Sequence, residues 1–249
     1  MISCIRYIRI AFVCGAGPRG ECPTRDAMRT IIFDLDNCLA PANEVGEELL
    51  DPVFAAVRAA NQGVLAPDAL EAALRECWVH AFDFVAAQHG FTERMRAAGA
   101  DAFREIEVRE PMHGYGDLDI LPSLGDLRFL VTSGFRRLQE SKVRALGIAP
   151  HFNAVIIDAV DEPDRRGKER IFAEIIARYR LARAEILVVG DNAESELAAA
   201  TRLGLPSAQI LRPGVVAAPG VATRVRDLAE LRALVANRGV VRGDGVRAT

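Results

Sequence analysis

Two carboxylates separated by one residue stand at the end of a short apolar run. Residues 30–33 read Thr-Ile-Ile-Phe, and Asp34, Leu35 and Asp36 follow directly. Side chains two residues apart on an extended chain point to the same side, so these two acids would repel each other and lose solvation. A hard divalent cation such as Mg²⁺ offsets both costs, because it prefers oxygen ligands. The alternative interpretation is an ordinary Asp-rich junction between a strand and a turn.

A further acid follows a second apolar run, Ile186–Val189. Asp191 comes two residues after this run and could complete a metal site with the first two acids. Asn192 and Glu196 lie just beyond it, together with Glu194, on what is expected to be the first turn of a helix. Acids in a first helical turn also complement the helix dipole. That effect is the alternative explanation for the two glutamates.

Two other places could hold a phosphate group. Thr132 and Ser133 follow the apolar residues 129–131, and a hydroxyl group with free backbone N–H groups at a strand-to-helix junction can bind phosphate oxygens. Simple capping of the next helix explains the same pair. Lys168 stands at an expected helix start, where the dipole disfavours a cation, which hints at a bound anion. A solvated lysine is the alternative.

Five short apolar runs rich in Ile and Val have the length and composition of buried strands. From the second run onward they alternate with segments of helical periodicity. This alternation predicts an α/β fold with a parallel sheet covered by helices on both faces. The expected strands are Thr30–Phe33, Arg128–Val131, Ala154–Ile157, Ile186–Val189 and Ser207–Leu211, and the expected helices among them are Phe135–Leu146, Lys168–Tyr179 and Glu194–Leu203.

The chain between the first two strands has a different composition and periodicity, with Ala-rich helical stretches and no strand pattern. We therefore expect a helical domain inserted into the sheet-bearing core, with hinges near residues 40–43 and 114–117. The expected helices of this insertion are Gly46–Asn61, Asp68–His89 and Thr92–Glu107. The expected division is a core of residues 29–42 and 118–238, a helical cap of 43–117, a poorly ordered extension of 1–28 and a flexible tail of 239–249.

The N-terminal extension contains a motif that resembles a dinucleotide-binding loop. Gly15, Gly17 and Gly20 spell G-x-G-x-x-G, but only nine residues separate Gly20 from the first strand. A dinucleotide site needs a helix after this loop, and none fits there, so we interpret the segment as a glycine-rich loop. Met28, directly before the first strand, is the expected true start of the protein.

The composition is that of a soluble globular protein. Of 249 residues, half are hydrophobic, and 31 Lys and Arg against 34 Asp and Glu give a net charge of −3. This balance predicts no nucleic-acid or membrane partner. The five cysteines are odd in number and have no close metal-binding spacing, which favours free thiols in the cytoplasm. The oligomeric state cannot be read from the sequence.

Taken together and in order, these motifs resemble those of the haloacid dehalogenase superfamily. The matching residues are the acids at 34 and 36, the segment 130–134, Lys168, and the segment 189–204 with Asp191 and Glu196. The resemblance implies a Rossmann-like core in three layers and a helical cap inserted between the first two motifs. It is nearest to the pyrimidine 5′-nucleotidase and phosphoglycolate phosphatase branches.

The resemblance also implies roles for single residues in a phosphatase. Asp34 would be the nucleophile that becomes an aspartyl phosphate, and Asp36 the general acid and base. Thr132, Ser133 and Lys168 would bind the phosphoryl group. Mg²⁺ would be held by Asp34, the backbone carbonyl of Asp36, and Asp191. Glu196 stands where relatives carry a second Asp, so it is expected to reach the ion through water, with Asn192 beside it.

The substrate implied is a small phosphorylated metabolite, with a pyrimidine nucleoside monophosphate favoured over sugar phosphates and phosphoglycolate. Asp36 argues against a 2-haloacid dehalogenase and against carbon–phosphorus cleavage, because those branches lack this acid. A phosphomutase keeps both acids and stays open as an alternative. So does a non-catalytic regulator that binds a phosphorylated ligand.

Overall fold

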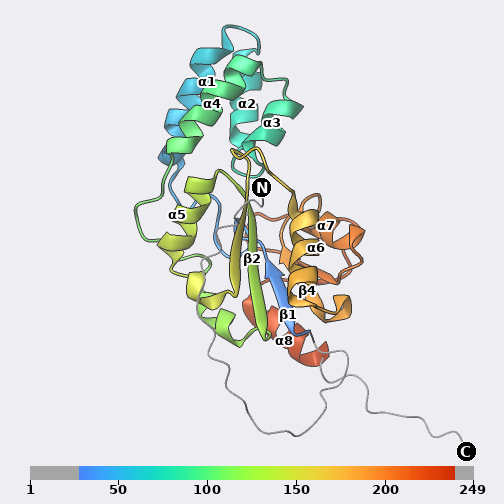
Figure 1. Cartoon of the computed structure of the whole chain (residues 1–249). Coiled ribbons are helices and arrows are strands. Elements are labelled where there is room, and N and C mark those ends of the chain that lie inside the picture. Colours follow the sequence, from blue (N-terminus) through green and yellow to red (C-terminus); the bar gives the residue numbers. More distant parts are fainter. Residues whose placement is uncertain (1–27, 239–249) are drawn as a thin grey trace, which may run out of the picture.

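Six parallel strands form one sheet in the computed structural model, in the order β3-β2-β1-β4-β5-β6 (Figure 1). The structure describes residues 28–238, so the expectations for residues 1–27 of the extension, its glycine motif and the C-terminal tail lie outside the described residues, whereas Met28 is buried in the core. The predicted parallel α/β sheet is confirmed. The strands are β1 (Thr30–Phe33), β2 (Leu127–Gly134), β3 (Ala154–Ala159), β4 (Ile186–Gly190), β5 (Ser207–Ile210) and β6 (Arg224–Val225).

Helices cover both faces of the sheet because successive side chains of the central strand point to opposite sides. Ile31 and Phe33 of β1 pack with α5 and α8, whereas Ile32 packs with α6 and α7. The result is a three-layer core. Its helices are α5 (Arg136–Leu146), α6 (Lys168–Tyr179), α7 (Glu196–Arg202) and α8 (Leu228–Arg238), with short 3-10 turns η2 (Leu118–Ser123), η3 (Ala149–His151) and η4 (Arg183–Glu185).

Strands β2 and β3 extend beyond their apolar residues. Residues 132–134 of β2 pair with residues 157–159 of β3, so backbone pairing continues through the polar ends that carry candidate site residues. The sequence places both ends too early, because hydrophobicity stops before hydrogen bonding does. Strand β6 has only two residues, too few for a recognisable pattern.

Four helices lie between β1 and β2 in the chain and pack at the end of the sheet where α5 begins (Figure 1). They share one apolar cluster, to which Phe135 and Leu138, at the start of α5, also belong. These inserted helices are α1 (Asp51–Asn61), α2 (Pro67–Glu76), α3 (Phe82–Gln88) and α4 (Glu93–Glu105), and the 3-10 turn η1 (Glu47–Leu50) precedes them.

The expectation of one helix over Asp68–His89 is wrong. The chain forms α2 and α3, joined by a turn in which the N–H groups of Val79 and His80 both donate to the carbonyl of Glu76. No Gly or Pro marks this break. It serves packing, because Phe82 is thereby buried in the cluster of the inserted helices. Of the other expected helices, Lys168–Tyr179 is confirmed as α6 with the same bounds, and the rest are shorter than predicted by one or more terminal residues.

Arg212, in the loop after β5, forms hydrogen bonds with both segments that connect the inserted helices to the sheet. Its guanidinium donates to the carbonyl of Cys38 (2.9 Å) and to both carboxylate oxygens of Asp117 (2.8 and 2.9 Å). Asp117 also accepts from the backbone N–H of Leu228, where α8 begins. Both connections are thus fixed to the sheet-bearing core at their bases.

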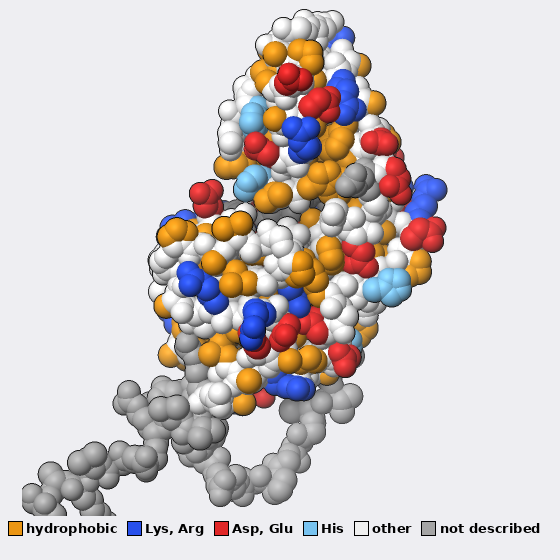
Figure 2. Space-filling model, turned by 180° about the vertical axis from the view of Figure 1, so that it is seen from behind, with side chains coloured by type: hydrophobic (Ala, Val, Ile, Leu, Met, Phe, Trp, Pro, Cys, Tyr) orange, Lys and Arg blue, Asp and Glu red, His pale blue; other side chains and the backbone are white. Residues whose placement is uncertain are grey.

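Figure 2 shows one face of the molecule, on which acidic and basic side chains are interspersed rather than gathered by sign. Within residues 28–238, no helix combines the length and apolar character that crossing a bilayer requires. Cys38 and Cys77 are free thiols.

Candidate active site

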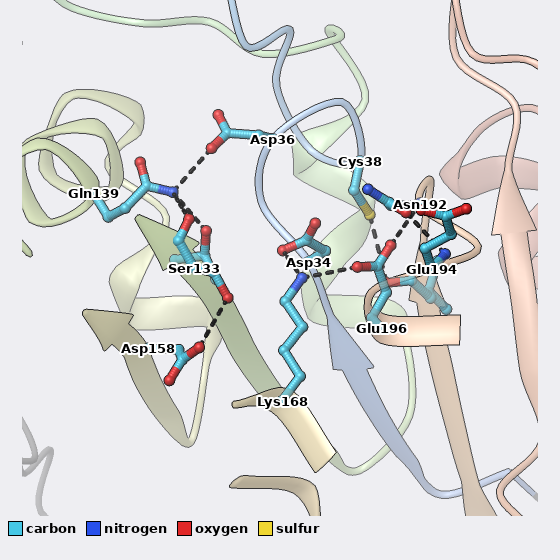
Figure 3. A network of polar contacts seen from close by, with 12 residues as sticks. Asp34, Asp36, Cys38, Ser133, Gln139, Asp158, Lys168, Asn192, Glu194 and Glu196 are labelled. Carbon is cyan, nitrogen blue, oxygen red and sulfur yellow. Dashed lines mark hydrogen bonds and ion pairs between the residues drawn. The ribbon is translucent and has the colours of Figure 1, made fainter. Parts of the chain in front are cut away.

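The ends of the two central strands bring three carboxylates together. Asp34 follows β1 and donates its backbone N–H to the carbonyl of Val189 on β4 (3.0 Å), so the polar residues after both strands are neighbours. One carboxylate oxygen each from Asp34, Asp191 and Glu196 lies within 4.8 Å of the others. These three form the carboxylate cluster, and Figure 3 shows Asp34 and Glu196 turned toward each other.

Lys168, at the first turn of α6, reaches into this cluster. Its Nζ atom lies 2.9 Å from Asp34 Oδ1 and 2.8 Å from Glu196 Oε2, and the residue is 8% exposed. Burial opposes its charge, but the two carboxylates raise the pKa of Lys168 above its ordinary value. The lysine is therefore cationic, and its single positive charge can balance only one of the three carboxylates when they ionise.

Burial, together with the neighbouring charges, shifts the pKa values of two of these acids. Burial raises the pKa of Asp34 to about 7; the ion pair with Lys168 opposes the rise and the charge of Glu196 adds to it. Burial, with the charges of Asp34 and Glu196, raises the pKa of Asp191 to about 8. Oxygen donors with uncompensated charge are the chemistry that a hard divalent cation satisfies. The residues present fit Mg²⁺.

Glu196 lies in the cluster rather than behind it. The residue is 1% exposed, and its carboxylate accepts a hydrogen bond from the backbone N–H of Asn192 (2.7 Å) in addition to its ion pair with Lys168. A Cβ atom at Gly190 would come within 2.2 Å of Glu196 Oε1. The glycine is therefore required for this approach. The Asn192 side chain accepts from the N–H of Glu194.

The carboxylate of Asp36 is directed away from the cluster, toward α5 (Figure 3). Its two oxygens pair with Lys142 Nζ (2.7 Å) and Gln139 Nε2 (2.9 Å). A tight turn follows, in which Asn37 has a left-handed φ of 54° and accepts the N–H of Ala42 on its side chain. Asparagine tolerates this conformation better than most residues.

Thr132 and Ser133 reach the same region from β2. Thr132 is buried, and its Oγ1 accepts a hydrogen bond from Gln139 Nε2 (2.6 Å). Ser133 Oγ donates to Asp158 on β3 (3.3 Å). Neither caps α5, whose N-cap residue is Phe135 and has no capping side-chain hydrogen bond. The capping alternative is thus excluded for both hydroxyls.

A cavity of about 330 Å³ connects these groups to the inserted helices. Asp34, Thr132 and Lys168 lie at its base, and residues of the α2–α3 turn and of α3 form part of its wall. The aromatic residues there differ in role. Phe82 belongs to the apolar cluster, whereas Phe84 is 45% exposed and its ring lies 5.1 Å from that of His80.

Sequence reasoning missed Lys142, Gln139 and Arg165 as residues near the site. Lys142 and Gln139 are three positions apart on α5 and therefore share one face. A polar pair on a face that also carries Leu138 and Val143 was the available signal. Arg165 stands in a loop and had no signal at all.

Comparisons with known proteins agree with one another. A family model for haloacid dehalogenase-like hydrolases matches residues 28–204. Glyceraldehyde 3-phosphate phosphatase of Methanopyrus kandleri is 27% identical over 204 residues, which cover 74% of this chain and 84% of that protein. A phosphatase of this superfamily from Thermococcus onnurineus has a TM-score of 0.55 at 20% identity, over 84% of this chain and 98% of its own. L-2-haloacid dehalogenase of Xanthobacter autotrophicus has a TM-score of 0.52 at 19% identity, over 84% and 98%.

Proposed function

The chain belongs to the haloacid dehalogenase-like hydrolases and is a phosphatase of that family, and we propose that it hydrolyses a small phosphomonoester with Mg²⁺ as cofactor through a phosphorylated Asp34. The observation that supports this reaction is the meeting of Asp34, Asp191 and Lys168 at the base of one cavity. A nucleophile, an oxygen site for a cation and a fixed positive charge are thereby available to one phosphate group.

Asp34, Asp191 and the backbone carbonyl of Asp36 would hold the ion. When bound, Mg²⁺ supplies positive charge that offsets the repulsion between a carboxylate and a phosphate dianion. Glu196 keeps Lys168 directed toward Asp34, because it contacts the ammonium group from the other side.

The protein side chains account for the two displacements. In the first, Asp34 Oδ forms a bond to phosphorus while the bond to the leaving oxygen breaks, and that oxygen takes a proton from Asp36. In the second, Asp36 takes a proton from water as the water attacks phosphorus, which releases phosphate and frees Asp34. Thr132, Ser133 and Lys168 bind the transferring phosphoryl oxygens throughout.

The inserted helices act in this proposal as the cap that selects the substrate and excludes water. A half-exposed aromatic ring in the cavity wall favours a leaving group with a flat ring, and Phe84 beside His80 provides one. We therefore place nucleoside 5′-monophosphates first. The relation to the Methanopyrus enzyme favours a second candidate, triose and sugar phosphates.

A phosphate-release panel tests the proposal. Nucleoside monophosphates, glyceraldehyde 3-phosphate, hexose phosphates, phosphoglycolate and p-nitrophenyl phosphate are each assayed with Mg²⁺ and with EDTA. We expect turnover only with Mg²⁺, highest for nucleotides, and lost by orders of magnitude in Asp34→Asn. Release that ignores EDTA would refute the cofactor. Absence of release from every ester would leave a binding protein instead of an enzyme, and a higher rate on triose phosphate would replace the nucleotide assignment.

A further inference from the structure

The two acids of the first motif are held by two different lysines. Asp34 pairs with Lys168 from α6, whereas Asp36 pairs with Lys142 from α5. The opposed ion pairs keep them apart, although their positions in the chain would put both side chains on the same side.

The contacts of Asp36 fix its orientation from two directions. Lys142 Nζ lies 2.7 Å from Oδ1, and Gln139 Nε2 lies 2.9 Å from Oδ2, so each oxygen has its own donor. Both donors come from well-buried residues, with Lys142 5% and Gln139 2% exposed. A carboxylate with one donor can rotate about it, but a carboxylate with two donors on a rigid helix cannot do so without losing one.

Gln139 in turn is positioned by the strand that it faces. Its Nε2 atom lies 2.6 Å from Thr132 Oγ1 and 3.3 Å from the carbonyl of Ser133. Gly134 makes this approach feasible, because a Cβ atom there would lie 2.9 Å from Gln139 Cγ. One amide thus links the acid at position 36 to the hydroxyl proposed to bind phosphate.

We infer that Lys142 and Gln139 are positioning residues for proton transfer by Asp36. Both residues line the cavity, where Lys142 Nζ and Gln139 Nε2 contact the carboxylate of Asp36. They hold the Asp36 carboxyl at a fixed place relative to Thr132, and Lys142 supplies the positive charge that matches the carboxylate left after Asp36 gives its proton to the leaving oxygen. The inference rests on the proposed function and specifies which residues fix the orientation of the Asp36 carboxyl.

Leaving-group acidity separates this role from a merely structural one. Phenyl phosphate and p-nitrophenyl phosphate share a ring and differ in how much their leaving oxygen needs a proton. In Lys142→Met, kcat/KM for phenyl phosphate should fall at least about tenfold more than for p-nitrophenyl phosphate, part of the roughly 10²–10⁴ that a positioned acid contributes. Asp36→Asn should show the same selectivity, and adding Lys142→Met to it should change the ratio no further.

Glu140→Gln is the matched control, because Glu140 lies on α5 between the two residues and its side chain is 53% exposed. It should leave both rates unchanged. If Lys142→Met does not fold, Gln139→Leu provides the second test and should raise the same ratio. Equal losses for both esters would overturn the inference. Failure of the wild type to hydrolyse p-nitrophenyl phosphate with Mg²⁺ would instead refute the proposed function.

Discussion

Asp34 and Asp191 bind protons more tightly in the folded protein than in the unfolded chain. Their pKa values, about 7 and about 8, are far above the roughly 3.9 of an unfolded aspartate. At pH values between the unfolded pKa and the two native pKa values, the native metal-free protein holds more protons than the unfolded chain. Its free energy of unfolding therefore falls as the pH rises through this window, because the cluster becomes charged while folded.

Mg²⁺ should reverse this dependence, because it binds the deprotonated carboxylates. We expect the Tm in EDTA to decrease from pH 5 to pH 8.5, and the increase in Tm on adding Mg²⁺ to be largest at pH 8.5. Thermal unfolding monitored by circular dichroism measures both. Asp191→Asn is the control, since it should flatten the curve in EDTA and remove most of the response to Mg²⁺. Parallel curves for wild type and variant would contradict the prediction.

For single residues, the sequence predicted which side chains lie at the site better than it predicted which side chains they contact. Asp34, Asp36 and Asp191 were expected to meet, with Lys168 facing them, because the ends of neighbouring parallel strands meet. The structure brings Asp34, Asp191 and Lys168 together, whereas the carboxylate of Asp36 is directed toward α5. Their catalytic roles stay predictions. The contact of Asp36 with Lys142 joins residues 106 positions apart, and no local pattern encodes which helix face a strand end will meet.

The helices of the insertion depend on one small residue where three of them meet. Gly99 lies in α4 and is buried against α1 and α3. A Cβ atom at this position would come within 2.2 Å of Phe82 Cζ and 2.9 Å of Val57 Cγ2. The ring of Phe82 is itself surrounded by Phe91, Phe103 and Phe135, so it has little room to move.

Gly99→Ala should therefore destabilise the protein although alanine is the better helix former. Overpacking costs about 1–3 kcal/mol, and the helix propensity gained returns roughly 1 kcal/mol. Urea unfolding should show a lower midpoint. Ala97→Ser, on the exposed face of the same helix, should lower the midpoint less, because it changes helix propensity alone. An unchanged or higher midpoint for Gly99→Ala would show that Phe82 is free to repack.

Elements were predictable where burial and periodicity agree. Strand β1 is buried throughout and α6 has its apolar side chains on one face, and both were assigned with correct bounds. The division between α2 and α3 was not predictable, because residues 77–81 continue the apolar spacing and contain no Gly or Pro. Tertiary packing of Phe82 determines that turn.

For the molecule as a whole, Arg165 connects the inserted helices to the sheet. It stands before α6, where it pairs with Asp158 at the end of β3 (3.2 Å), and it also contacts Asp83 of α3. Asp158 is buried and fixed, whereas Asp83 is 45% exposed. The ion pair between Arg165 and Asp83 is therefore the one that can break when the inserted helices move away from the sheet-bearing core.

Asp83→Asn should weaken substrate retention more than stability. A half-exposed pair contributes under about 1 kcal/mol to folding, but its loss increases the fraction of molecules in which the cavity is open, and KM rises accordingly. We expect KM for p-nitrophenyl phosphate to rise severalfold with kcat little changed.

Added salt should raise the KM of the wild type and leave the KM of the Asp83→Asn variant unaffected. Asp101→Asn, which removes an ion pair within α4, should leave KM at the wild-type value; an identical KM for Asp83→Asn would exclude the bridge from this role.

The position of β1 at the centre of the sheet has a consequence for synthesis. Its two neighbours, β2 and β4, are encoded far downstream, and β4 leaves the ribosome roughly 150 residues after β1. At about 5–20 residues per second, this interval is on the order of ten to thirty seconds. Until β2 has also been synthesised, the nascent chain carries a mostly apolar segment with neither pairing edge satisfied, so residues 30–33 are a segment that a chaperone would shield.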